Sequence, residues 1–81
     1  MIRLGKTARK QPEEIIKQAI EFFGPDGYKL EIKEQDEGRV YLQGGGGGVE
    51  VTAVAGEKGT SVDIVATEWE HQAKEFLGKL K

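Results

Sequence analysis

The chain has 81 residues and a formal net charge of −2, from 12 lysines and arginines against 14 aspartates and glutamates. This length suits one domain, residues 1–81, with one modest hydrophobic core. The chain has no cysteine, which excludes disulfide bonds and thiolate metal sites, and no apolar run near the roughly 20 residues that a membrane span needs. We therefore expect a cytoplasmic protein that needs no cofactor and does not enter a membrane.

The first ten residues are basic, whereas the rest of the chain is acidic. Such a segment can bind an anion or a nucleic acid, but it is also typical of an ordinary solvated strand and loop. We favour the solvated segment, because a few charges beside an acidic body attract phosphates weakly. We expect at most a short edge strand at residues 2–4, followed by a polar connection to residue 11. The candidate anion-binding residues are Arg3, Lys6, Arg9 and Lys10.

A helix is predicted over residues 12–23. Pro12 suits the first helical position, and two glutamates follow it where negative charge favours the N-terminal end of the helix dipole. Gly24 and Pro25 end the helix, because neither favours its continuation. Apolar residues recur at helical spacing and give this helix a broad apolar face: Ile15, Ile16, Ala19, Ile20, Phe22 and Phe23.

Four strands are predicted to follow as an antiparallel meander. In each of them apolar side chains alternate with polar ones, as in a strand with one buried face. Turn residues or glycines separate each strand from the next. The strands are expected at residues 28–34, 39–43, 49–55 and around 61–66, with these inward residues: Tyr28, Leu30, Ile32, Val40, Leu42, Val49, Val51, Ala53, Ala55, Val62, Ile64 and Ala66.

The five consecutive glycines Gly44–Gly48 join two of these strands. Glycine has no Cβ, so it can adopt a positive φ and let other atoms approach the backbone, and a permissive β-hairpin connection is the favoured interpretation. The alternative is a nest of backbone N–H groups that binds an anion. A phosphate loop needs a lysine and a hydroxyl residue at its end and a helix directly after it, whereas Val49 and Glu50 begin a strand here.

A second helix is predicted over residues 68–80. Thr67 and Glu70 have the spacing of a capping box, in which Thr67 would be the N-cap. Acids lead this helix and lysines follow near its end, which complements the helix dipole. The apolar face of this helix comprises Trp69, Ala73, Phe76, Leu77 and Leu80.

Both helices must bury an apolar face, and the inward face of the sheet is the available place. We therefore predict an α+β fold. It is a two-layer sandwich in which a four-stranded antiparallel meander, with a fifth N-terminal edge strand as an option, has both helices on one face. The opposite face would be open to solvent and would mix acids with bases. Three residues on it could offer a small apolar surface to a partner or to a second copy of the chain: Tyr41, Val54 and Val65.

The chain offers little for catalysis. His71 is the single histidine, and Glu75 follows it one helical turn later. Such a pair can contribute to a metal site or to a proton shuttle, but two ligands alone hold a metal poorly. We name no catalytic residue and no metal site, and an enzyme is the least favoured class, because one histidine and no cysteine form no nucleophile–base set.

The order short strand, helix, four-stranded meander and helix, over nearly the whole chain, resembles two known architectures. One is a single repeat of the TATA-box-binding-protein fold, which implies DNA bending by aromatic residues on the open face, where Tyr41 lies. The other is a trimmed form of the helix-grip fold of START-type lipid-transfer and pollen-allergen proteins. This second resemblance implies a small apolar ligand between the last helix and the sheet, held by Trp69, Phe76, Phe22 and Phe23.

Three functional hypotheses remain, because a fold alone does not determine a function. The favoured hypothesis is a small non-catalytic binding or protein-interaction domain that contacts a protein partner or a second copy of itself. The second is a carrier of a small apolar ligand, which needs an apolar cavity of roughly 300 Å³ or more. The third is weak nucleic-acid binding through the basic N-terminal segment, which salt would weaken.

Overall fold

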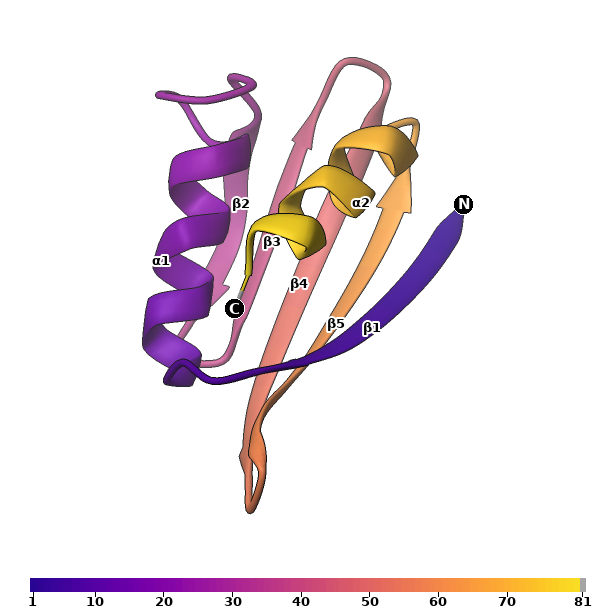
Figure 1. Ribbon diagram of the computed structural model, residues 1–81. Coiled ribbons are helices and arrows are strands. Elements are labelled where there is room, and N and C mark those ends of the chain that lie inside the picture. Colours follow the sequence, from indigo (N-terminus) through magenta and orange to yellow (C-terminus); the bar gives the residue numbers. More distant parts are fainter. Residues whose placement is uncertain (81) are drawn as a thin grey trace.

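The computed structural model describes residues 1–80, which form one open five-stranded antiparallel sheet with two helices packed on one face (Figure 1). The predicted α+β class is confirmed, and the N-terminal segment supplies the fifth strand. The elements in chain order are β1 (Ile2–Ala8), α1 (Pro12–Phe23), β2 (Glu31–Asp36), β3 (Arg39–Gly44), β4 (Gly47–Gly56), β5 (Gly59–Thr67) and α2 (Glu70–Lys79).

The strands lie in the order β1-β5-β4-β3-β2, and each neighbouring pair is antiparallel. Strands β2 to β5 form the predicted meander. β1 pairs with β5 and forms the edge of the sheet opposite β2. The connection through α1 therefore links the two edges of the sheet. In the helical layer, α1 packs over β3 and β4, and α2 packs over β1 and β5. Figure 1 shows both helices on the same face of the sheet.

β1 is longer than predicted, because it extends over Ile2–Ala8 rather than residues 2–4. It pairs with β5 along its whole length. The sequence pattern is interrupted at Lys6, where a charged residue occupies an inward position between apolar ones. This lysine reaches the backbone of α2, so its inward position is explained by a contact that is distant in sequence.

β2 begins at Glu31, later than the predicted residue 28. The preceding loop folds back onto the end of α1, where the N–H of Leu30 donates a hydrogen bond to the carbonyl oxygen of Phe23 at 2.8 Å. Lys29 has a φ of 67°, so the backbone is not extended there. The alternating pattern before Glu31 therefore belongs to a loop, with Leu30 buried and Tyr28 exposed.

A β-bulge interrupts the pairing of β2 with β3. Lys33 is the extra residue between Ile32 and Glu34, which face consecutive residues of β3. The alternation of sides shifts by one after a bulge of this kind. Glu34 consequently lies on the open face of the sheet, and Gln35 lies on the side of the helices.

The glycine run forms the predicted hairpin connection. Gly45 and Gly46 make its two-residue turn with φ values of 59° and 83°, the two positive values that a type I′ turn requires. Gly44 and Gly47 pair as the last rung of the β3–β4 ladder. Gly47 also lies so close to the carbonyl oxygen of Thr67 that a Cβ would collide with it. The run thus combines a tight turn with a close approach of two strands.

α2 begins at Glu70, and the predicted capping box is wrong. Thr67 is the last residue of β5, where it pairs with Gly48, and it is therefore not at the start of the helix. Glu68 has a φ of 67° and turns the chain between the strand and the helix. Trp69 occupies the N-cap position and makes no side-chain cap hydrogen bond.

α2 is fastened to the sheet at both ends. At its start, the indole Nε1 of Trp69 donates a hydrogen bond to the carbonyl oxygen of Gly44 at 2.8 Å. At its end, the Nζ of Lys6 donates to the carbonyl oxygens of Leu77 at 2.8 Å and Leu80 at 2.6 Å. The last carbonyls of a helix lack intrahelical donors, and positive charge is favourable beside them. The glycine hairpin and β1 thus hold the helix in place.

One hydrophobic core lies between the two helices and the inward face of the sheet. Most residues predicted to face inward are in it, but Ala55 is exposed near the β4–β5 turn. No helix within residues 1–80 is long and apolar enough to cross a membrane. The buried hydrophobic residues are Ala8, Ile15, Ile16, Ala19, Phe23, Leu30, Val40, Leu42, Val49, Val51, Ala53, Val62, Ile64, Ala66, Ala73, Phe76, Leu77 and Leu80.

Replacement of Lys6 by methionine tests the fastening of α2. We expect Lys6→Met to lower the free energy of unfolding by about 1–2 kcal/mol, because two carbonyl oxygens lose a charged donor. Urea unfolding followed by the fluorescence of Trp69 measures this loss. Lys58→Met in the exposed β4–β5 turn is the control and should leave stability unchanged; an equal loss in both variants would contradict the interpretation.

Two glycine substitutions should have opposite effects. Gly46→Ala should destabilise the protein by about 1 kcal/mol, because alanine is strained at a positive φ. Gly78→Ala should stabilise it by about 0.5–1 kcal/mol, because alanine favours a helix and a Cβ there meets no other atom within 4 Å. Thermal unfolding of the two variants measures both effects. A neutral Gly46→Ala would be inconsistent with the type I′ turn.

Candidate functional site

Aromatic side chains gather where the end of α1 and the loop after it meet α2. The ring centroids of Phe22, Phe23 and Phe76 are 4.9 to 5.6 Å apart, and those of Tyr28 and Trp69 are 5.6 Å apart. These rings include the four residues that the helix-grip resemblance assigns to an apolar ligand. They pack against one another, and none of the principal hollows found in residues 1–80 lies between α2 and the sheet.

The Tyr28 hydroxyl donates a hydrogen bond to Oε1 of Glu75 at 3.0 Å and so joins the loop to α2. This hydrogen bond raises the pKa of Tyr28 above its ordinary value, with smaller contributions from desolvation and from the negative charge of Glu75. His71, one turn before Glu75, is exposed. Within residues 1–80 no group of three or more histidine, aspartate or glutamate side chains is placed to hold a metal ion.

The four basic residues of the N-terminal segment lie in different places. Arg3 is opposite Val65 in the sheet and exposed, whereas Lys6 lies on the helix side and caps α2. Arg9 and Lys10 line a hollow beside the β4–β5 turn. The fold therefore does not gather these charges on one surface, as binding along a phosphate backbone would need.

The residues proposed as an apolar partner surface are also separated. Tyr41 and Val65 lie in one row across the open face, with Glu50 between them. Val54 lies further along β4, opposite Ser61, and is 60% exposed. The face offers isolated apolar side chains among polar ones rather than one apolar patch.

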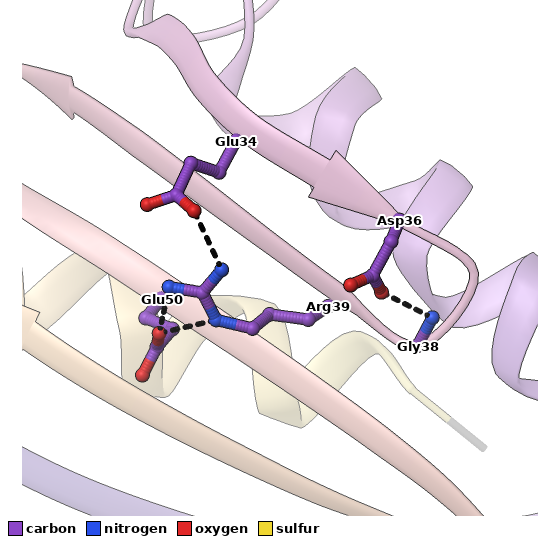
Figure 2. A network of polar contacts seen from close by, with 5 residues as sticks. All are labelled: Glu34, Asp36, Gly38, Arg39 and Glu50. Carbon is purple, nitrogen blue, oxygen red and sulfur yellow. Dashed lines mark hydrogen bonds and ion pairs between the residues drawn. The ribbon is translucent and has the colours of Figure 1, made fainter.

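Arg39 connects three strands across the open face (Figure 2). Its Nε and Nη2 atoms both lie 2.6 Å from Oε2 of Glu50 on β4, and its Nη1 lies 3.4 Å from Oε1 of Glu34 on β2. The hydrogen bond with Glu50 is the main cause that raises the pKa of Arg39. In the β2–β3 turn, Oδ1 of Asp36 accepts a hydrogen bond from the N–H of Gly38 at 3.0 Å. These contacts tie the edge strand β2 to the middle of the sheet.

A shallow hollow of 450 Å³ lies on the open face over Gly47 and Gly48, where the strands carry no side chains. Tyr41 and Val65 line it, as do Arg39 and Glu50, which are already paired with each other. Gln43 and Thr67 also line the hollow, so its lining mixes their polar side chains with the paired charges of Arg39 and Glu50.

The largest of the principal hollows is a groove of 570 Å³ between α1 and β2. Ile16 and Ile20 line it from α1, and their spacing of one turn places them on the same side of the helix. Gln35 lines it from β2. Charged residues also line the groove, four carboxylates against one ammonium: Glu13, Glu21, Asp36, Glu37 and Lys17.

The groove lies at the end of a free edge of the sheet, where Gln35 and Asp36 of β2 line it. β2 is the last strand on its side, and all of its residues except Ile32 are exposed. An edge strand presents N–H and C=O groups that pair with no neighbouring strand. The free backbone groups of β2 and the apolar groove are therefore neighbours at the end of β2. Figure 1 shows α1 running alongside this strand. The groove and this edge together are called the β2 site below.

The β2 site was not predicted from the sequence. The periodic apolar face of the first helix predicted that Ile16 and Ile20 pack toward the core, and they do, with Ile16 buried and Ile20 half-buried. That both also line a groove was not predicted. Two features of the sequence could have indicated the site. The apolar face of the first helix is broad, with six apolar residues, and the turn around Asp36 and Glu37 is acidic. Nothing in the sequence showed that this turn and the helix would be neighbours.

Comparison of the chain with models of protein families, with curated proteins and with solved structures gives no significant match. The resemblance to a helix-grip or TATA-box-binding-protein fold therefore stays a prediction.

The hydrogen bond between Tyr28 and Glu75 predicts a specific titration. In a Tyr41→Phe background, Tyr28 should ionise above its ordinary pKa, and Glu75→Gln should lower that pKa, as measured by the ultraviolet absorbance of tyrosinate. Because the pKa is raised in the folded state, the stabilisation is present below the unfolded pKa of about 10 and is lost as the pH rises through the folded pKa. An unchanged titration after Glu75→Gln would contradict the contact.

Proposed function

We propose that this chain is a non-catalytic protein-interaction domain, which binds an extended segment of a partner protein at the β2 site. One observation supports this proposal above the others: an open groove with an apolar wall lies directly beside a free strand edge. A peptide added to an edge gains main-chain hydrogen bonds, and adjacent pockets for alternate side chains give specificity.

The edge is also held in a defined shape before a partner arrives. Arg39 pairs with Glu34 of β2 and with Glu50 of the central strand, and the turn after β2 is closed by Asp36. A receptor that is already ordered loses less conformational entropy when it binds. The paired charges across the open face thus support recognition at the neighbouring edge.

The other two hypotheses have weaker support. A carrier needs an enclosed apolar cavity, and the aromatic residues assigned to it pack against one another. Nucleic-acid binding needs a continuous basic surface, and one of the four basic residues, Lys6, is engaged with the end of α2.

Selection of peptides from a random displayed library tests the proposed function. We expect peptides that bind the protein and slow amide hydrogen exchange in β2, because added main-chain hydrogen bonds protect the edge. Exchange measured with and without a selected peptide maps the bound surface residue by residue. Failure to select any peptide, or protection confined to strands other than β2, would falsify the proposal.

A pair of matched variants tests, in the same experiment, whether the selected peptides bind in the groove. Ile20→Arg places a charge in the groove, whereas Gln18→Arg places the same charge elsewhere on α1. Ile20→Arg should abolish binding of the selected peptides and Gln18→Arg should preserve it. Circular dichroism must show that both variants are folded, and equal binding by the two folded variants counts against the groove.

A further inference from the structure

We infer that the segment bound at the β2 site is basic, with apolar side chains at alternate positions and lysine or arginine between them. This inference rests on the proposed function and adds the chemical class of the partner. It follows from three features of the site: the spacing of its apolar residues, the charge around them, and the charge of the edge itself.

The spacing of the apolar wall matches an extended chain. Ile16 and Ile20 are four residues apart, which corresponds to a rise of about 6 Å along a helix. Alternate side chains of a strand are about 6.6 Å apart, from a rise of about 3.3 Å per residue. A strand beside β2 can therefore place two successive inward side chains along this wall, one against the half-buried Ile20 and one over Ile16, which is 3% exposed.

The charge around the groove favours a cation. Within residues 1–80, none of the groove carboxylates of Glu13, Glu21, Asp36 and Glu37 forms an ion pair with a lysine or arginine side chain. Lys17 is the one basic residue that lines the groove. Complementary charge across an interface steers association and selects partners, so lysine or arginine beside the apolar positions of the segment fits this surface.

The acids of β2 also oppose a second copy in the same place. Pairing of two β2 strands would bring Glu31, Glu34 and Asp36 of each copy together, and like charges on neighbouring strands are destabilising. This repulsion disfavours contact between two β2 edges and leaves the site to a segment of opposite charge.

Two designed peptides test the inference. One alternates valine with lysine, and the other alternates valine with glutamate. We expect the valine–lysine peptide to bind, to protect β2 from hydrogen exchange, and to bind more weakly as salt concentration rises, since salt screens exposed charges. The valine–glutamate peptide should not bind measurably in calorimetric titration. Equal affinity for the two peptides, or tighter binding of the acidic one, overturns the inference.

Two neighbouring glutamates provide a matched pair of variants. Glu13 and Glu14 are both exposed in the first turn of α1, but only Glu13 lines the groove. Glu13→Lys should weaken binding of the valine–lysine peptide by about threefold to fivefold, the size expected for an exposed charge pair, and Glu14→Lys should change it less. Equal weakening in both variants overturns the inference, because it indicates attraction to net charge alone.

The outcomes separate this inference from the proposed function. If library peptides protect β2 but show no preference for basic residues, the protein-interaction function stands and the inferred class of partner fails. If no peptide protects β2, the proposed function itself fails. Light scattering at low salt tests whether the occupant is a second copy of the protein. If the protein associates with itself, and Arg3→Glu on the β1 edge abolishes that association, the β2 site binds the β1 edge of a second copy. That result would overturn the inference.

Discussion

The packing of Trp69 against a turn made of glycine is the contact on which this small fold depends. The indole N–H bonds the carbonyl oxygen of Gly44, and a Cβ on Gly45 would lie 2.9 Å from the indole ring. The turn thus has glycine for two reasons, its positive φ and the space that the ring requires. Lys6 holds the other end of α2, so a helix of 10 residues is positioned by groups from both halves of the chain.

The arrangement of the helical layer decides which surfaces stay free. With α2 over β1 and β5, α1 covers β3 and β4 and leaves β2 at the margin. β2 therefore combines an uncovered edge with a groove along α1, while Arg39 ties it to the centre of the sheet. The open face has a hollow of its own, of 450 Å³, but Arg39 and Glu50 in its lining are paired with each other. This division of the surface supports the protein-interaction role that we propose for the β2 site.

The elements that were predicted well are those whose signals are local. The first helix has the predicted bounds, since Pro12 marks its start and Gly24 its end within the adjacent sequence. The β3–β4 hairpin follows from its glycines. The errors occurred where a residue serves a distant partner: Lys6 interrupts the pattern of β1 because it caps α2, and Thr67 pairs in the sheet instead of capping a helix.

The spacing of apolar residues along the chain was enough to predict the fold class, which face of the sheet is buried, and most of the core, because periodic burial of apolar residues depends only on that spacing. It did not determine that β1 pairs with the last strand, where α2 begins, or that Ile16 and Ile20 border a groove. Those features depend on which elements become neighbours. The packing of both helices on one face of the sheet decides this. The β2 site exists because α1 and an edge strand meet there, and tertiary packing alone brings them together.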